Sequence, residues 1–246
     1  MLKKIVLTGA AGRLGTILQA PLAALCDELV CADIVDAIPG HPANARYQRA
    51  DVADYDQVAA LMEGVEMVVH FGAIVDEGPF MELLGPNFAG SYNVWESAFL
   101  AGARRIIYAS SIHAVGMHKR QDFIGIDAPH APDTFYGLAK CFTEDLGKMY
   151  WDKRGLESVH LRILSCDDVK TTRMLGTWLS DGVLAQVGER SIDTPTTGFQ
   201  IVYGVSDNDR APVDNHLARH LGYRPKDNAE QFAKDMLAAD PVGDPT

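Results

Sequence analysis

A tyrosine and a lysine four residues apart, Tyr136 and Lys140 in the sequence FYGLAK (135–140), form a pair that can perform acid/base chemistry. Residues four apart lie on one face of a helix, so the phenol and the ammonium can meet. A nearby ammonium favours the ionised phenolate, and such a tyrosine can exchange a proton with an alcohol near neutral pH. The same spacing is also typical of a tyrosine stacked over a lysine on a surface helix, so its meaning depends on the motifs around it.

Three glycines near the start of the chain form such a motif. Gly9, Gly12 and Gly15 make a Gly-x-x-Gly-x-x-Gly pattern between a predicted strand at 3–8 and a predicted helix at 13–25. Glycines let the backbone turn sharply and approach a pyrophosphate, and the N-terminus of the helix then faces the anion. We therefore predict a dinucleotide-binding turn, with Arg13 and Leu14 among its contacts.

An acid at the end of the second predicted strand indicates which dinucleotide is bound. Asp33, followed by Ile34, lies roughly 20 residues after the turn, where a carboxylate can accept hydrogen bonds from the adenine ribose. A carboxylate would repel the 2′-phosphate of NADP, so Asp33 favours NAD. Arg13 argues the other way, because a base in the glycine turn could meet that phosphate.

Residues that follow the next predicted strands complete the predicted cofactor contacts. The carboxyl ends of parallel strands meet at one edge of a sheet, and ligands bind there in open α/β folds. Small side chains after the fourth strand would let the cofactor lie close to the backbone. The predicted contacts are Asp51, Val52, Phe71, Gly72, Ala73, Ile74 and Ile163.

The elements that must position these residues alternate between strand and helix, which predicts an α/β fold with a Rossmann-type doubly wound parallel sheet. We expect a long helix over 80–100 with a break near Pro86, and a helix over 134–153 that carries Tyr136 and Lys140. After residue 165 strands and helices no longer alternate regularly. In this part we expect a helix near 173–180, a strand at 200–203 and a last helix near 228–239. The predicted parts are a dinucleotide-binding core at 1–165 and a small substrate-binding part at 166–246, with a frayed tail from about 241.

Composition narrows the classes of partner. The 246 residues carry a formal net charge of −11, which argues against nucleic acid and anionic membranes. There is no apolar run of about 18 residues that would predict a transmembrane helix, and the first predicted strand leaves no room for a signal peptide. We expect a cytoplasmic homo-oligomer with reduced cysteines and a small-molecule substrate. His216 and His220 lack a third ligand at a suitable spacing, so no metal site is predicted.

The motifs together resemble those of the extended short-chain dehydrogenases/reductases. The resemblance rests on the glycine turn, Asp33, Asp51-Val52, Asn87-x-x-Gly90, Ser110-Ser111 and Tyr136-x-x-x-Lys140. It implies NAD as cofactor, Ser111 as a ligand of the substrate oxygen and Tyr136 as the acid/base. It also implies that Lys140 holds the nicotinamide ribose and makes Tyr136 more acidic.

Within this family the chain is similar to the uronate dehydrogenase subgroup, which oxidises the anomeric carbon of galacturonate or glucuronate to a lactone. The similar runs include SSIH (110–113), RILSC (162–166), RMLGTW (173–178) and LGYRPKDN (221–228). The similarity implies that Arg173 engages the sugar carboxylate and that Ser165 and His113 line the same pocket. Val75 and Ile112 depart from the pattern, because the subgroup usually has a serine and an asparagine there that contact the sugar.

Three functions remain open from the sequence. The leading one is an NAD-dependent dehydrogenase of a polar secondary alcohol or lactol, with a sugar acid as the leading substrate. The second is a related reductase or epimerase that acts on a less hydroxylated substrate; nucleotide-sugar epimerases have a larger C-terminal domain, for which ~80 residues leave little room. The third is a non-catalytic dinucleotide sensor, against which the intact set of Ser111, Tyr136 and Lys140 argues.

Overall fold

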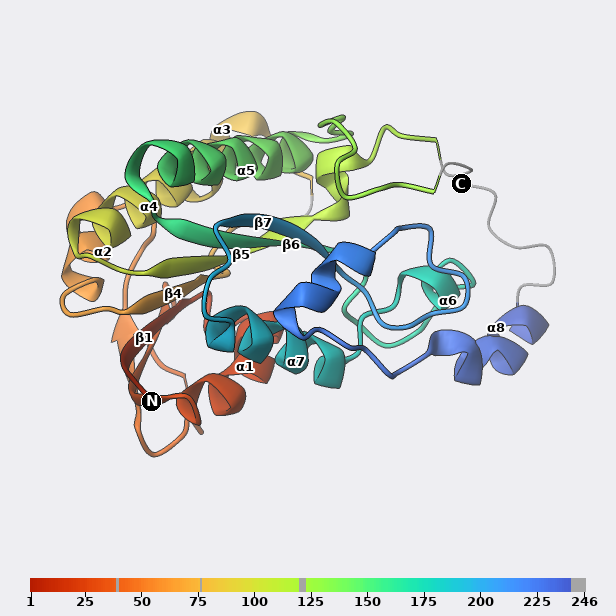
Figure 1. Cartoon of the computed structure of the whole chain (residues 1–246), viewed down its shortest axis with the longest axis horizontal. Helices are drawn as coiled ribbons and strands as arrows, with labels where there is room; N and C mark the ends of the chain where they lie inside the picture. Colours follow the sequence, from red (N-terminus) through yellow and green to blue (C-terminus); the bar gives the residue numbers. More distant parts are fainter. Residues whose placement is uncertain (39, 76, 120–122, 240–246) are drawn as a thin grey trace.

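A sheet of seven strands forms the centre of the molecule, in the order β3-β2-β1-β4-β5-β6-β7 (Figure 1). This computed structural model describes residues 1–38, 40–75, 77–119 and 123–239; the predicted tail from 241 lies outside them. The strands are β1 Leu2–Thr8, β2 Cys26–Asp33, β3 Ala45–Arg49, β4 Met67–His70, β5 Arg105–Ser111, β6 Glu157–Ile163 and β7 Phe199–Gly204. Every neighbouring pair is parallel, which confirms the predicted Rossmann-type sheet.

Helices cover both faces of the sheet (Figure 1). One face carries α1 (Arg13–Ala23) and α7 (Asp181–Asp193), and the other carries α2 (Tyr55–Leu61), α4 (Gly90–Leu100) and α5 (Phe135–Arg154). The remaining short elements are α3 Phe80–Leu83, η1 Leu84–Ala89, η2 Ile112–Val115, α6 Met174–Thr177, η3 His216–Leu221, η4 Ala229–Phe232 and α8 Ala233–Ala239. Among the described helices, none combines the length and apolar character that crossing a membrane requires.

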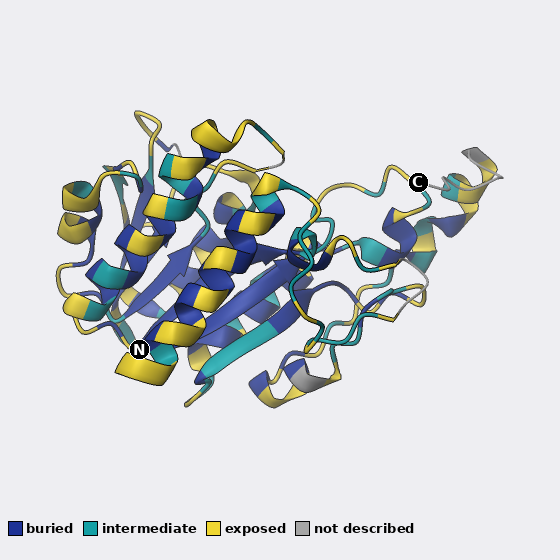
Figure 2. Cartoon of the chain, turned by 90° about the horizontal axis from the view of Figure 1, so that it is seen from above, coloured by how far each residue is buried: buried dark blue, intermediate teal, exposed yellow. Residues whose placement is uncertain are grey.

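The core lies in two apolar layers, one on each side of the sheet. Every residue of β5 and β6 is buried, because helices cover both of their faces. Figure 2 shows most of the sheet as a buried layer, with the outer sides of the helices exposed. The edge strands β3 and β7 have several partly exposed residues. The strands are therefore fixed in position, and their carboxyl ends form a rigid edge for a site.

The helix that carries Tyr136 and Lys140 has clear signals at both ends. The side chain of Thr134 accepts a hydrogen bond from Gly137 N at 2.8 Å and caps the N-terminus of α5. Gly155 ends the helix in the left-handed conformation, with φ of 71°. The helix predicted over 134–153 is thus confirmed to within one residue at each end.

The helix predicted over 80–100 is interrupted where Pro86 was expected to break it. The segment forms α3, then the π-helical turn η1, then α4. Proline has no N–H to donate to the helix, and a π-helical turn accommodates the extra residue. The turn places the side chain of Asn87 inside the protein, where it is 2% exposed.

The helix predicted near 173–180 is wrong beyond Thr177. Trp178 is extended and pairs with Ser165, and Ser180 then caps α7 by accepting a hydrogen bond from Val183 N. The prediction missed α7, whose buried residues include Val183, Leu184 and Val187 at helical spacing. Gly182 and Gly188 weaken the local helix signal, so the capping serine and the apolar spacing were the signals that could have found it.

Candidate active site

The predicted dinucleotide turn lies where the strand order reverses, between β1 and β4. Gly9 has φ of 70°, and a Cβ there would lie 2.5 Å from the backbone carbonyl carbon of Phe71. Only glycine therefore permits the turn after β1 to touch the loop after β4. Gly12 then begins α1 with no side-chain cap, and its first turn includes Leu14 and the buried Gly15. This cradle fits a dinucleotide phosphate, because open α/β sheets bind ligands at this switch point.

The carboxylate of Asp33 is fixed at the end of β2. Its two oxygens accept hydrogen bonds from Ala11 N at 2.9 Å and Ile34 N at 2.7 Å. One bond comes from the glycine turn itself, so the acid and the turn hold each other in place. An ionised carboxylate has about four acceptor sites, and those that remain can accept from a ribose diol.

The guanidinium of Arg13 points away from Asp33, toward the other end of the sheet. Its Nε donates to Cys166 O at 2.9 Å and its terminal nitrogen pairs with Asp181 at 3.0 Å. Cys166 follows β6 and Asp181 begins α7. The cation that could have met a 2′-phosphate is therefore engaged on the side opposite to the predicted ribose site.

Hydrogen bonds hold the loop that follows β4. The side chain of Asn87 accepts from Ile74 N and donates to Ile74 O, both at 2.9 Å. Gly72 N donates to Thr8 Oγ1 at 3.1 Å. Phe71 and Ala73 complete this loop beside the glycine turn.

The predicted contacts after β3 and β6 lie at the same edge of the sheet. Asp51 accepts a hydrogen bond from Ala53 N through its side chain, and Val52 is buried below it. Ile163 is the last residue of β6 and pairs with Ser111 of β5. The structure therefore places the predicted cofactor residues along one edge, while their contacts with a cofactor stay a prediction.

Lys140 is buried at the centre of the site, and its side chain is enclosed by aromatic rings. Its Nζ donates to Ala109 O at 2.6 Å and lies 4.7 Å from the ring centre of Tyr108 and 4.9 Å from that of Tyr136. Burial lowers the pKa of Lys140 to about 7, and the charge of Glu144 acts in the opposite direction. The tyrosine and the lysine thus meet as their spacing predicts, with the ammonium against the phenol ring.

Glu144 connects the helix α5 to two strands of the sheet. Its carboxylate accepts hydrogen bonds from Ser110 Oγ at 2.5 Å and from Arg162 at 3.0 and 2.8 Å, and contacts His130 at 2.8 Å. Burial alone would raise the pKa of Glu144, but the hydrogen bonds from His130 and Arg162 keep it below its usual range. A buried charge so completely paired fixes α5 against β5 and β6.

Ser111, His113 and Tyr136 lie together at the end of β5. His113 N donates to Ser111 Oγ at 3.2 Å, and the imidazole meets the ring of Tyr136 edge-on at 5.8 Å. Asp133 contacts Nδ1 of His113 with both carboxylate oxygens, at 2.9 and 3.0 Å. The sequence pattern gave no signal for Asp133, because it lies 20 residues from His113 in an irregular loop.

The predicted carboxylate ligand Arg173 is exposed at the start of α6. One helical turn later, Thr177 Oγ1 lies 3.0 Å from Ser165 Oγ, and Ser165 follows β6. Arg173 therefore lies about one helical turn from the residue that contacts Ser165.

The two predicted apolar contacts lie in different surroundings. Ile112 is partly buried and packs against the cluster that includes Tyr203, Val205 and Val213. Val75 is 66% exposed in the loop after β4. Neither side chain can supply the hydrogen bond that a polar residue would give at its position.

Comparison with known proteins identifies the family. Residues 5–166 match the NAD dependent epimerase/dehydratase family, and this match spans more than half of the chain. The chain belongs to this family. The match includes the glycine turn, Asp33, Ser111, Tyr136 and Lys140, so the resemblance seen in the sequence is confirmed.

Relatives within the epimerase/dehydratase family are similar over nearly the whole chain. A uronate dehydrogenase from Pseudomonas putida is 42% identical, and the alignment covers 99% of this chain and 92% of the relative. The crystal structure of a variant uronate dehydrogenase from Agrobacterium tumefaciens, complexed with NAD, is 38% identical with a TM-score of 0.94; the match covers 100% of this chain and 93% of that one. A glucuronic acid dehydrogenase from Chromohalobacter salexigens is 34% identical with a TM-score of 0.95, over 100% and 92% of the two chains.

We predict that this family member discriminates between the two nicotinamide dinucleotides through Asp33. Asp33→Ala removes a charge-assisted acceptor, whose loss typically costs about 1.5–3 kcal/mol, so the affinity for NAD should fall about 10-fold or more. The affinity for NADP should fall less, so the preference for NAD over NADP should become smaller. Fluorescence titration of both dinucleotides measures the effect. Asp27→Ala, an exposed acid near the other end of β2, is the control, and an unchanged preference in Asp33→Ala would contradict the assignment.

Proposed function

We propose that the protein oxidises a hexuronic acid, such as galacturonate or glucuronate, at its anomeric carbon to an aldarolactone, with NAD as the hydride acceptor. The observation that carries the proposal is the 42% identity to a uronate dehydrogenase over 99% of the chain. That similarity extends beyond the dinucleotide turn into residues 166–239, which we propose supply the substrate side of the site.

In the proposed oxidation, Tyr136, Lys140 and Ser111 have different roles. Bound NAD would accept the hydride that leaves the anomeric carbon. Tyr136 takes the proton of the anomeric hydroxyl, and the nearby ammonium of Lys140 favours the phenolate form that can do so. Ser111 Oγ accepts from His113 N, so its own O–H is left to donate to the substrate oxygen. One C–H and one O–H bond break, and the C=O bond of the lactone forms.

The carboxylate of the substrate is assigned to Arg173. A guanidinium presents two parallel N–H groups that match a carboxylate, and Arg173 lies exposed on the α6 side of the site. Ser165 and His113 complete the polar lining. With Val75 and Ile112 apolar, fewer groups remain to recognise the sugar hydroxyls.

The same chain is proposed to form a homo-oligomer through an exposed apolar face. On α3, η1 and α5, the rings of Phe80, Phe88, Phe135 and Phe142 contact one another at 5.4–5.6 Å between centres. Phe80, Phe135 and Phe142 are 37%, 48% and 37% exposed. Exposed apolar side chains that contact one another are typical of a protein–protein contact, and a second copy of the chain is the partner proposed.

The first prediction of this proposed function concerns Tyr136, the residue that takes the proton. Tyr136→Phe removes the phenol oxygen that takes the substrate's proton and keeps the ring, so kcat for uronate oxidation should fall about 10²-fold or more while NAD still binds. NADH absorbance and a dinucleotide titration measure the two effects. Tyr55→Phe, on an exposed tyrosine of α2, should behave as the wild type. Full activity of Tyr136→Phe would refute the mechanism and favour the dinucleotide sensor.

The second prediction concerns the carboxylate. Arg173→Met should raise KM for galacturonate about 10- to 150-fold, because a charge-assisted contact is typically worth about 1.5–3 kcal/mol. The neutral sugar galactose, which has no carboxylate to lose, should be turned over equally by both proteins. Arg190→Met, on an arginine in an exposed ion pair of α7, is the control. Equal KM values for galacturonate in wild type and Arg173→Met would show that Arg173 does not bind the substrate carboxylate.

The third prediction concerns the oligomer. Phe142→Asp places a charge in the apolar face, so the mass measured by light scattering after gel filtration should drop to that of one 26.8 kDa chain. Leu100→Asp, on an exposed leucine at the end of α4, tests whether any surface charge has this effect. A wild type that already runs as a single chain would exclude the oligomer.

A further inference from the structure

A histidine–aspartate pair lies beside the phenol of Tyr136. Both carboxylate oxygens of Asp133 are within 3.0 Å of His113 Nδ1, and the imidazole meets the ring of Tyr136 edge-on. The side chains are 40% and 27% exposed, for His113 and Asp133 respectively. The pair is therefore reachable by a substrate and partly sheltered from water.

The fold holds Asp133 in a fixed place. It directly precedes Thr134, the capping residue of α5, and Thr134 Oγ1 donates to Asp133 Oδ1 at 3.2 Å. Gly116 follows η2, and a Cβ there would lie 2.1 Å from Asp133 Oδ2. The carboxylate fills the space that any larger residue at 116 would need, so it lies against the backbone of the turn that carries His113.

This geometry determines which nitrogen of His113 carries its proton. A carboxylate only accepts hydrogen bonds, so Nδ1 must be the protonated nitrogen of the neutral imidazole. Nε2 then presents a lone pair. Among the residues that the structure describes, none bonds Nε2, because the hydrogen bonds of His113 are those of its backbone N and of Nδ1.

We infer that Asp133 is a positioning residue for substrate recognition: it orients His113 so that Nε2 accepts a hydrogen bond from a hydroxyl group of the sugar. The inference rests on the proposed function and names how that site recognises its substrate. Ile112 packs into the apolar cluster beside β7 and Val75 has no polar atom in its side chain. Recognition of sugar hydroxyls next to Tyr136 therefore depends on His113 more than on Ile112 or Val75.

A double-mutant cycle separates this role from a merely structural one. His113→Ala should raise KM for galacturonate about tenfold, the loss expected for one hydrogen bond, with kcat within threefold of wild type. Asp133→Ala should have a similar effect because it acts through His113. The double variant should then match His113→Ala within about twofold. A product of the two effects, near 100-fold, would show that Asp133 acts independently and would overturn the inference.

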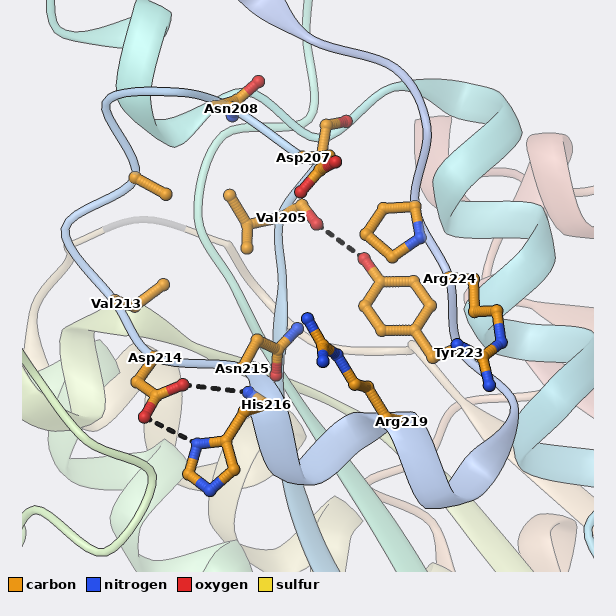
Figure 3. A pocket seen from close by; sticks show the side chains of 13 residues that line it. Val205, Asp207, Asn208, Val213, Asp214, Asn215, His216, Arg219, Tyr223 and Arg224 are labelled. Atoms are coloured by element: carbon orange, nitrogen blue, oxygen red, sulfur yellow. Dashed lines mark hydrogen bonds and ion pairs between the residues drawn. The ribbon is translucent and has the colours of Figure 1, made fainter.

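Two further variants guard against a loss of folding. Asp133→Asn keeps an oxygen that accepts from Nδ1–H, so it should retain KM within about threefold of wild type. Asp214→Ala is the matched control, because Asp214 and His216 form a second such pair, with Oδ2 and Nδ1 2.6 Å apart (Figure 3). That pair lines a separate pocket with Arg219 and Tyr223, and the pocket includes none of the predicted site residues. A rise in KM in Asp214→Ala equal to that in Asp133→Ala would contradict a specific role.

Nitrogen-15 NMR of the His113 imidazole tests the positioning independently of the substrate. We expect the Nδ1-protonated form in the wild type and its loss in Asp133→Ala. A wild type protonated at Nε2 would overturn the inference even if uronates are oxidised. Failure of the wild type to oxidise any uronate would instead refute the proposed function, while the NMR result would still decide the role of Asp133.

Discussion

The buried ammonium of Lys140 is the constraint on which the rest of the site depends. Moving a charge out of water is costly, and burial accordingly lowers the pKa of Lys140 to about 7. Contacts with Ala109 O and with two tyrosine rings offset part of this cost. These partners belong to β5 and to the first turn of α5. The lysine can only lie there if the helix and the strand keep one register, and the bonds of Glu144 to Ser110 and Arg162 maintain that register.

The same register brings together residues with different tasks. Tyr136 and Lys140 come from α5, while Ser111 and His113 come from the end of β5 and the turn after it. The glycine turn lies two strands away, and its contact with Phe71 fixes it to the loop after β4. Each group is therefore held by backbone geometry rather than by the ligand, which is what a pre-organised site requires.

Local patterns predicted the parts of the structure that local physics decides. The glycine turn, the sheet strands and α5 with its Thr134 cap could be predicted because spacing and capping lie within a few residues of each other. The pairing of Arg13 with Asp181, 168 residues apart, could not be predicted in this way, and neither could that of Asp133 with His113. Such pairs depend on which loops the tertiary fold brings together. The sequence analysis did not predict the helix α7. Its apolar residues do recur at helical spacing, but its two glycines lower the helix propensity of the segment.

The bond between Arg13 and Asp181 has a consequence for how the protein folds while it is being synthesised. The glycine turn is complete in sequence by residue 15, yet the first residue of its helix is tied to Cys166 and Asp181. Leu18 of the same helix shares an apolar layer with Leu184 and Val187. A ribosome must therefore synthesise some 170 further residues before the first helix has all its neighbours. During synthesis, α1 therefore lacks these contacts until residues 166–187 have been made.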